Sequence, residues 1–321
     1  MEGPRPKVSV YTPTYNYGRF LGEAIQSVLG QTFQDWELIV VDDGSTDDTR
    51  EVVDAFADSR IHYVYQQNRG NPAARNVALR LAKGEYIAFL DADDLWFPEK
   101  LQKQVAQLDG LASTVGLVYG DVYLFNHEDG AIICRFLRGR RPPRGRVFDE
   151  LLDTDGWFIS DTGSLIRREV FQRVGLYDES LLTYEDWEMW VRIASAYEVE
   201  ALDEPVARCR RHGNNLGRRV EEMYQYGLAA RRKVMGSYSL SRQERRVLRR
   251  NLAQHEYSYG TGLLQLGRRG KAWKAFLRSV RLRPGARKTY IHLGLPLLSP
   301  RLYNFLSGSY STIKGWLSRA K

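Results

Sequence analysis

Short apolar segments that alternate with longer amphipathic ones constrain the fold of the first third of this chain. Four runs of four or five residues are rich in β-branched and aromatic side chains, namely Val8–Tyr11, Leu38–Val41, Ile61–Tyr65 and Tyr86–Leu90. Runs this short predict strands, and their unbroken apolar character is typical of strands buried on both faces. Helix-compatible segments lie between them, at Phe20–Leu29, Asp47–Ala57 and Pro72–Lys83. This alternation predicts a doubly wound, mainly parallel sheet.

Acidic residues follow two of the predicted strands. The pair Asp42–Asp43 follows the second strand, and the segment Asp91–Asp94 follows the fourth. Because ligands bind beyond the carboxyl ends of the strands in such sheets, we expect these carboxylates to share one edge. The alternative is that each cluster caps the helix or turn that follows, which accounts well for Ser45–Asp48. It accounts poorly for Asp91–Asp94, since like charges at one rim repel one another unless a cation lies among them.

Five motifs occur in a fixed order along the chain. They are VSVYTPTYN (8–16), VVDDGSTDDT (40–49), GNPAARNVAL (70–79), GEYIAFLDADD (84–94) and YEDWEMWVR (184–192). Together they resemble the inverting family 2 glycosyltransferases of the GT-A fold, from about residue 7 to about residue 215, or two thirds of the chain. Each motif alone is weak evidence, but five in the family's order and approximate spacing are strong evidence. The resemblance implies a Rossmann-like GT-A domain over residues 1–215 that binds a nucleotide-sugar.

This resemblance also implies a divalent cation, Mn²⁺ or Mg²⁺, in a DxD-type motif. The chemistry agrees, because one or two carboxylates, phosphate oxygens and water are the usual ligands of such an ion. Bound there, the ion is a Lewis acid for the departing diphosphate. Carried over from the family, Asp93 is the metal ligand, Asp91 lies near the metal or the ribose, and Ala92 stands between them. His212 is a further candidate ligand, and an imidazole favours Mn²⁺ over Mg²⁺.

Nucleoside recognition is expected, by the same resemblance, on the loop after the first strand. Pro13, Tyr15 and Asp43 match the family's positions, with Tyr15 stacking on the base and Asp43 accepting a hydrogen bond from a base N–H. Arg75 and Arg211 are candidate contacts of the diphosphate. Structural alternatives are a packed loop aromatic for Tyr15, a surface helix arginine for Arg75 and a solvated charge for Arg211. UDP-sugar is the favoured donor on family frequency alone.

An acceptor hydroxyl attacks well only when a base removes its proton, an effect of about 10²–10⁴-fold. The family's motif places this base at Asp186 in Tyr184-Glu185-Asp186-Trp187, with Glu185 as the fallback. The alternative, which does not exclude catalysis, is that both acids stabilise the dipole of a helix starting here. Trp157 and Asp161 are candidate contacts of the acceptor.

Charge divides the chain into two parts. Residues 208–321 carry 26 Lys/Arg and 4 Asp/Glu, a net charge of +22, whereas residues 1–207 have a net charge of −14. Such asymmetry suggests different partners for the two parts. Helix-forming residues predict an all-α domain over residues 216–321.

One stretch of this domain has the spacing of a single tetratricopeptide-like unit, carried by Tyr259, Gly260, Gly267, Ala272, Phe276 and Pro284. Since stable arrays need about three repeats, we expect a helical hairpin rather than a peptide-binding array. Apolar and aromatic residues lie beside cations at 295–305 and 310–321, which favours an anionic membrane surface over nucleic acid as a partner. Homo-oligomerisation through these helices is a further expectation.

The sequence therefore predicts a metal-dependent inverting glycosyltransferase that acts on a glycan or lipid-linked acceptor in cell-surface polysaccharide synthesis. Two cysteines without CxxC spacing, and no apolar stretch of 18 residues, favour a cytoplasmic location, peripheral on the inner face of the plasma membrane. One alternative is a non-catalytic nucleotide-sugar-binding or scaffold protein. The other, a sugar-nucleotide nucleotidyltransferase, is disfavoured because Tyr11–Asn16 is neither glycine-rich nor basic.

Overall fold

The computed structural model describes residues 5–154, 158–212 and 220–294. The chain divides into two compact units, Met1–Leu216 and Gly217–Lys321. Among the described residues, the helices are too short or too polar to span a bilayer. Trp157 and the segments 295–305 and 310–321, for which the sequence predicts acceptor and membrane contacts, lie outside the described residues.

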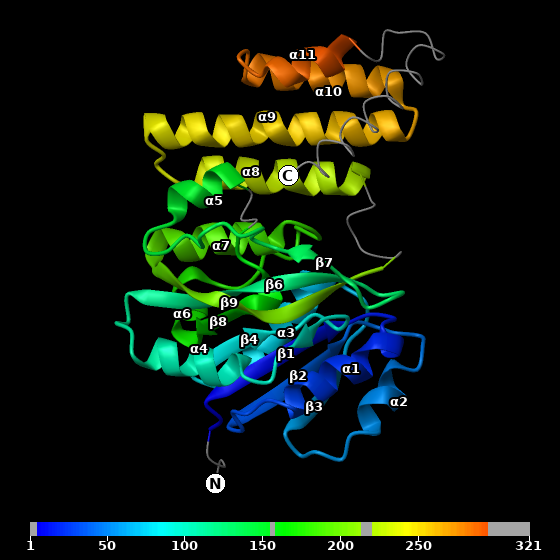
Figure 1. The fold of residues 1–321 in the computed structure, drawn as a ribbon, viewed down its shortest axis with the longest axis vertical. Helices are drawn as coiled ribbons and strands as arrows, with labels where there is room; N and C mark the ends of the chain where they lie inside the picture. Colours follow the sequence, from blue (N-terminus) through cyan, green and yellow to red (C-terminus); the bar gives the residue numbers. More distant parts are fainter. Residues whose placement is uncertain (1–4, 155–157, 213–219, 295–321) are drawn as a thin grey trace. The chain divides into compact units, whose positions relative to one another are not determined.

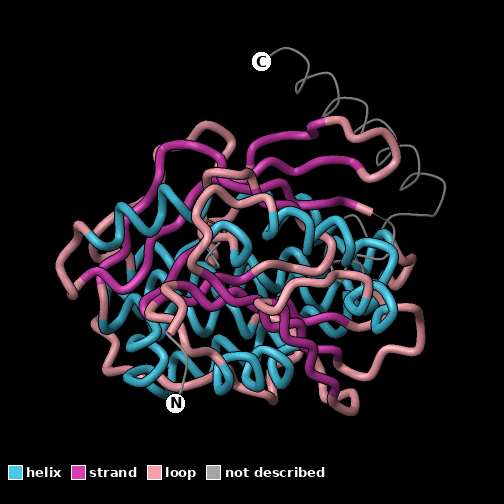
Figure 2. The backbone as a smooth tube through the Cα atoms, turned by 90° about the horizontal axis from the view of Figure 1, so that it is seen from below, coloured by secondary structure: helices cyan, strands magenta, loops and turns pink. Residues whose placement is uncertain are grey.

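A nine-stranded mixed sheet forms the centre of the first unit, with helices on both of its sides (Figures 1 and 2). Its order is β3-β2-β1-β4-β8-β6-β9-β5, and β7 pairs with β6. The strands are β1 (Val8–Thr14), β2 (Trp36–Asp42), β3 (Ile61–Tyr65), β4 (Tyr86–Phe89), β5 (Leu95–Trp96), β6 (Val115–Asn126), β7 (Ile132–Arg135), β8 (Ser164–Arg167) and β9 (Glu198–Arg211). The helices are α1 (Gly18–Leu29), α2 (Thr49–Asp54), α3 (Asn71–Leu81), α4 (Lys100–Asp109), α5 (Phe148–Thr154), the 3₁₀ helix η1 (Asp161–Gly163), α6 (Arg168–Val174) and α7 (Glu185–Ala196).

The first half of the sheet is parallel, as the sequence predicts. β1 pairs in parallel with both β2 and β4, and β2 pairs in parallel with β3. Alternate side chains of these strands, such as Val8 and Val10, join a core with residues of α1 and α4, while α3 packs on β1 and β2 from the other face. Because side chains alternate along a strand, both faces are buried only where helices cover both.

Two local predictions for this half are wrong. Ile61–Tyr65 is expected to be buried on both faces, but β3 is the edge strand and Tyr65 is 58% exposed. The helix expected over 47–57 is the shorter α2, and Asp47 lies before it as a cap, with its carboxylate accepting from the backbone N–H of Thr49 (3.2 Å) and of Gly18 (3.0 Å). A single carboxylate thus satisfies free N–H groups at the start of two helices.

The second half of the sheet adds antiparallel pairs. β8 lies antiparallel between β4 and β6, β9 pairs in parallel with β6, and the two-residue β5 pairs antiparallel with β9. This last pairing matters for the site, because β5 begins directly after the acidic segment that ends at Asp94. It brings the end of β9 beside that segment.

The second unit consists, in its described part, of the helices α8 (Val220–Ser237), α9 (Arg242–Gln265), α10 (Arg269–Leu282) and α11 (Arg287–Gly294). α9 packs against both α8 and α10, and a cluster of buried aromatic and aliphatic side chains lies among them. The predicted hairpin is confirmed as α9 and α10. Its close approach depends on Gly260, since a Cβ there would lie 2.6 Å from the Phe276 ring.

Substituting Gly260 by Ala is therefore expected to destabilise the helical unit by about 1–3 kcal/mol, because the new methyl group overpacks against a fully buried ring. Gly270→Ala is the matched control, since a Cβ at that position of α10 meets nothing within 4 Å. It should be neutral or stabilising, as alanine favours a helix over glycine by up to about 1 kcal/mol. Urea unfolding followed by circular dichroism measures both variants. Equal effects of the two substitutions would contradict the packing argument.

Candidate active site

Three carboxylates gather on the turn after β4. Because β1, β2 and β4 are parallel, their carboxyl ends share one edge, and Asp91, Asp93 and Asp94 follow the last of them. Burial, together with the neighbouring carboxylates, raises the pKa of Asp91 well above its usual range. The same causes raise the pKa of Asp94 to about 8. The segment therefore concentrates negative charge that is costly unless a cation compensates it.

The end of β9 supplies cationic partners for this turn. Arg210 is 5% exposed and donates through its backbone N–H to Asp94 Oδ1 (2.9 Å) and through Nε to the carbonyl of Asp93 (2.9 Å). Its Nη2 donates to Glu23 of α1 (2.8 Å). Arg211, next along the strand, is exposed. Arg210 thus holds the acidic turn in place from within, while Arg211 lies at the surface.

His212 lies against the second carboxylate of the turn. Its Nε2 is 3.0 Å from Asp93 Oδ2, its side chain is 3% exposed, and its ring packs near Phe20. Within residues 5–154, 158–212 and 220–294, no set of three His, Cys, Asp or Glu side chains is placed to hold a metal ion by itself. Hard divalent cations need no such set, because one or two carboxylates suffice when substrate phosphates complete the shell. Asp91, Asp93 and His212 are chemically suited to that arrangement.

Two loops at the same edge are tied together where the nucleoside is expected. Pro13 is buried in β1, opposite Val41, and Tyr15 follows the strand with 48% of its surface exposed. Asn16 adopts a left-handed φ of 57°. Its Oδ1 accepts from the N–H of Thr46 (2.8 Å), which joins the loop after β1 to the loop after β2. Tyr15 is thus available to a flat ligand.

Asp42 and Asp43 have different environments. Asp42 accepts from the backbone N–H of Ser45 (2.7 Å) and from the hydroxyl of Tyr63 (2.6 Å), so the capping alternative is correct for this residue. Asp43 is buried and holds the loop before α3. Its carboxylate accepts from Gln66 Nε2 (2.6 Å) and from the N–H groups of Arg69 (2.9 Å) and Gly70 (2.8 Å).

Arg75 is not a surface helix arginine. It is 4% exposed, its Nη1 donates to Asp161 Oδ2 (2.8 Å), and its Nη2 lies 3.6 Å from Glu185 Oε1. The rings of Phe89 and Tyr177 lie near its guanidinium, with centroids at 4.2 and 5.1 Å. Arg75 also acts electrostatically on Asp91, lowering its pKa against the larger effect of burial. One buried guanidinium therefore links α3, η1 and α7 to the acidic turn.

Two atoms of this network, Arg75 Nε and Asp161 Oδ1, are buried without a hydrogen-bond partner among the described residues. Burial raises the pKa of Asp161 to about 6, against the opposing effect of Arg75. The structure thus places Asp161 in the buried network beside Glu185. Its expected contact with an acceptor stays a prediction.

The two acids that begin α7 are separated by burial. Tyr184 precedes them with a left-handed φ of 64°, an uncommon conformation for a residue other than glycine. Glu185 is 5% exposed and faces Arg75 and Asn71, whose Nδ2 donates to it (3.1 Å). Burial raises its pKa to about 8. Asp186 is only partly buried, and its carboxylate accepts a hydrogen bond from the N–H of Trp187 (2.6 Å). Asp186 is therefore the more accessible carboxylate.

Sequence reasoning missed several residues that shape this site. The buried role of Arg210, the ion pair of Arg75 with Asp161, and the hydrogen bonds of Gln66 and Arg69 that hold Asp43 all depend on contacts between distant segments. The sequence does contain one indication of Arg210. Three carboxylates within Asp91–Asp94 predict that a cationic group lies close to them.

The sequence model described as Glycosyl transferase family 2 matches residues 9–175, more than half of the chain. A putative teichuronic acid biosynthesis glycosyltransferase of Bacillus subtilis, TuaG, is 32% identical over 216 residues, 66% of this chain and 82% of that protein. An Escherichia coli protein is 32% identical over 197 residues, 61% of this chain and 73% of its own length. Its name is UDP-Glc:alpha-D-GlcNAc-diphosphoundecaprenol beta-1,3-glucosyltransferase WfgD. An uncharacterized glycosyltransferase of Rickettsia prowazekii is 33% identical, but the match spans only 61% of that relative.

Solved structures share the fold. Residues 1–349 of Staphylococcus aureus TarS match with a TM-score of 0.63 and 21% identity, covering 87% of this chain and 81% of that one. The mannosyltransferase PcManGT of Pyrobaculum calidifontis, solved with GDP-Man and Mn²⁺, has a TM-score of 0.58 and 22% identity over 98% of this chain and 86% of its own. The first unit therefore has the GT-A fold, and several helices follow it.

The raised pKa of Glu185 predicts how stability depends on pH. A carboxyl group whose pKa rises from 4.5 to about 8 on folding stabilises the folded state fully below pH 4.5, and this contribution is lost as pH rises toward 8. Glu185→Gln removes the group. Its free energy of unfolding, relative to wild type, should rise by about 2 kcal/mol or more between pH 5 and 8, since each pKa unit is worth about 1.4 kcal/mol.

Urea unfolding at a series of pH values measures this difference. Glu51→Gln, on the exposed part of α2, controls for the loss of one carboxylate. A difference that stays constant with pH would show that Arg75 keeps Glu185 ionised throughout.

Proposed function

This chain belongs to glycosyl transferase family 2, and we propose that it transfers a sugar from a nucleotide-sugar, with inversion, to a hydroxyl group of a glycan or lipid-linked acceptor. The observation that carries the proposal is the pair of acidic centres that Arg75 connects. On one side the Asp91–Asp94 turn is held by Arg210, and on the other the accessible Asp186 begins α7. The first suits a diphosphate with its cation, and the second suits a base.

The donor's diphosphate would bind at the acidic turn through a divalent cation, Mn²⁺ or Mg²⁺. Asp93 and Asp91 would hold this ion, with His212 beside Asp93. When bound, the ion supplies Lewis-acid stabilisation of the leaving diphosphate. Arg211, exposed at the end of β9, would meet phosphate oxygens directly. The raised pKa values of Asp91 and Asp94 show that ionising these carboxyl groups together is costly without a cation, which supports a cation bound there.

The nucleoside would lie over Tyr15, with Pro13 below it and the Asp43 carboxylate at the base edge. Tyr15 is exposed directly after β1, which suits stacking. Asp43 already accepts three hydrogen bonds, so a base N–H would be a further partner of a pre-positioned carboxylate. Because the group is fixed before the ligand arrives, little ordering is required of it.

Asp186 would take the proton of the acceptor hydroxyl as the hydroxyl attacks the sugar. Glu185 is less suited, because a carboxyl with a pKa of about 8 is mostly protonated at neutral pH and is enclosed by Arg75 and Asn71. Arg75 would instead position this end of α7 and lend positive charge close to Asp91. Its Nε and the Asp161 Oδ1, which have no hydrogen-bond partner in the part of the chain that the structure describes, are polar atoms that a substrate oxygen or hydroxyl could meet.

UDP-sugar is the favoured donor. The name of WfgD specifies UDP-Glc and a lipid-diphosphate acceptor, and TarS has been solved with UDP-GlcNAc. PcManGT, with GDP-Man and Mn²⁺, supports the metal but a different base. A lipid-linked acceptor would make this a peripheral enzyme of the cytoplasmic membrane face, in cell-surface polysaccharide synthesis. The name of TuaG, in teichuronic acid biosynthesis, supports that role.

A thermal-shift panel of UDP, GDP, dTDP and CMP, each with and without Mn²⁺ or Mg²⁺, tests the donor site. We expect UDP with metal to stabilise the protein, by about 2.7 kcal/mol at 100 times its dissociation constant. Asp93→Asn should abolish the metal-dependent part. Asp35→Asn, which removes an exposed carboxylate just before β2, should keep it. No shift from any nucleotide with folded protein would favour the scaffold alternative.

Turnover of UDP-glucose or UDP-GlcNAc with a GlcNAc-diphosphate lipid tests the base. Asp186→Asn should lower kcat by about 10²–10⁴-fold, because the hydroxyl proton has no acceptor. The nucleotide-dependent thermal shift should remain, which separates catalysis from donor binding. Glu185→Gln should reduce kcat less. The opposite ranking of the two variants would make Glu185 the base.

A further inference from the structure

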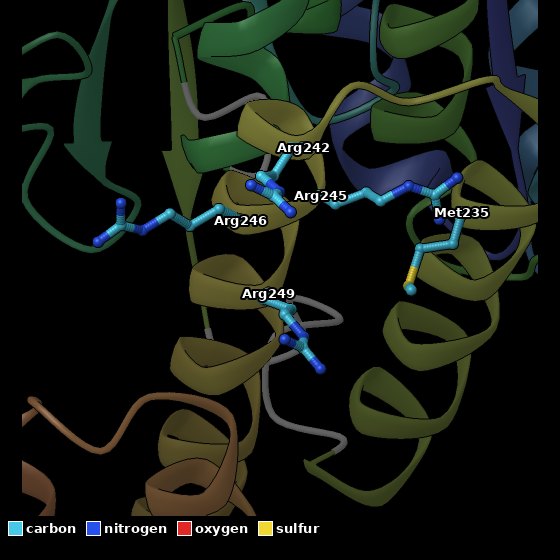
Figure 3. Close-up of a pocket in the computed structure, with 5 residues that line it drawn as sticks. All are labelled: Met235, Arg242, Arg245, Arg246 and Arg249. Atoms are coloured by element: carbon cyan, nitrogen blue, oxygen red, sulfur yellow. The ribbon is translucent and has the colours of Figure 1, made fainter.

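An open hollow in the helical unit is lined almost entirely by arginine. Its volume is about 700 Å³, and its lining residues are Met235, Arg242, Arg245, Arg246 and Arg249 (Figure 3). The four arginines follow the spacing i, i+3, i+4 and i+7 along α9, so they are neighbours on the helix surface. In Figure 3 Arg245 reaches toward α8, which carries Met235, while Arg246 extends in the opposite direction. All four side chains are exposed.

In the described part of the helical unit, these arginines have no acidic partners. The helices of this unit contain four glutamates, of which Glu221 pairs with Arg268 and Lys271, and Glu256 pairs with Arg278 (2.9 Å). Glu244 accepts from the backbone N–H of Ser241 in a capping box. Glu222 lies in the first turn of α8, about 20 Å along that helix from Met235.

Among the described residues, therefore, no carboxylate pairs with Arg242, Arg246 or Arg249. Arg245 donates from Nε to the carbonyl of Leu240 (3.0 Å), which fixes it beside the loop between α8 and α9. The hollow has concentrated positive charge with no compensating group in the part of the unit that the structure describes.

The position of these charges on α9 is also unfavourable for the helix. Arg242, Arg245 and Arg246 lie in its first two turns, at the positive end of the helix dipole, where cations destabilise. The capping box already satisfies backbone N–H groups at this end, so the arginine side chains rather than the backbone would contact a ligand. An anion held among the guanidinium groups would relieve both the mutual repulsion and the conflict with the dipole.

The lining fits an anion that also carries apolar surface. The arginine stems and the thioether of Met235, which is 37% exposed, give the hollow an apolar wall beneath the guanidinium groups. Guanidinium groups bind phosphate oxygens in a bidentate manner. A phosphodiester on a glycerol-linked acyl chain presents both features together, whereas a free phosphate ion presents only the first.

We propose that this hollow binds the phosphate headgroup of an anionic phospholipid and so attaches the helical unit to a membrane surface. None of its residues is among those named for sugar transfer, so a failure of this proposal would leave the proposed donor and acceptor sites unaffected. The proposed ligand is a lipid headgroup. Free phosphate and nucleic acid backbones share the phosphate but lack the acyl-linked apolar part.

Vesicle flotation with the full chain tests this site. The vesicles are phosphatidylcholine with or without phosphatidylglycerol, at low and at physiological salt. The variant Arg242→Gln/Arg246→Gln/Arg249→Gln is compared with the control Arg281→Gln/Arg283→Gln/Arg287→Gln. The control removes the same charge from exposed positions of α10, α11 and the loop between them. Arg245 is kept because it bonds to the Leu240 carbonyl.

We expect wild type to bind phosphatidylglycerol vesicles. General attraction to the surface falls by about fivefold for each lost cation, equally in both variants, and therefore cancels in their comparison. The hollow variant also loses direct hydrogen bonds to the headgroup, so it should bind at least about tenfold more weakly than the control. Unchanged thermal unfolding and an unchanged thermal shift with UDP and metal would show that both variants are folded.

Four results would overturn the proposal. Absence of binding to phosphatidylglycerol vesicles at low salt would exclude a lipid as the ligand. Equal losses of vesicle affinity in the two variants would show that only net charge matters. Inorganic diphosphate that displaces wild type from the vesicles, at concentrations that leave the control variant bound, would show that the hollow binds a soluble anion. A single-stranded RNA that binds wild type, loses affinity in the hollow variant and displaces the vesicles would assign it to nucleic acid.

Discussion

Electrostatic repulsion among the carboxylates on the turn after β4 is the constraint on which the rest of the first unit depends. Three acids in four residues, two of them with strongly raised pKa values, cannot be buried together without compensation. The protein places Arg210 through the turn and Arg75 behind it, and both guanidinium groups are almost fully buried. Each of these arginines in turn requires its own acids, Glu23 for one and Asp161 with Glu185 for the other. The active-site region is thus a chain of alternating charges in which every member restrains its neighbours.

Much of this arrangement could be predicted from local sequence, and the reason is physical. The strands β1, β2 and β4 are apolar runs because helices cover both faces, and their ends are marked by Asp42 and Asp91. The start of α7 was visible in the acids before Trp187. What could not be predicted was the partner of each charge. Arg75 and Asp161 are 86 positions apart, and Arg210 and Asp93 are 117 apart. The two-residue strand β5, whose pairing with β9 creates the second contact, carries too little pattern to be recognised.

In the helical unit, by contrast, cationic side chains far outnumber the acids that could pair with them. Two of its few glutamates, Glu221 and Glu256, hold helices together; Glu256 pairs with Arg278 and accepts from the hydroxyl of Tyr224. Arg231, which is fully buried, donates to Asn251 Oδ1 (2.7 Å) and to the carbonyl of Gly227 (2.7 Å). Stability here comes from close helix packing, such as Gly260 against Phe276. Surface arginines are consequently left to interact with whatever lies outside the unit.

The three hydrogen bonds that Asp43 accepts limit how this protein can be redesigned. The carboxylate that is expected at the base edge also anchors Arg69 and Gly70, directly before α3, the helix that carries Arg75. Gly70 itself has a φ of 88° and little room for a side chain, so the anchor has no simple substitute. A substitution at Asp43, made to change the proposed base contact, would also loosen the scaffold. Engineering a different donor would therefore begin at Tyr15, whose side chain is exposed and does not anchor a neighbouring loop as Asp43 does.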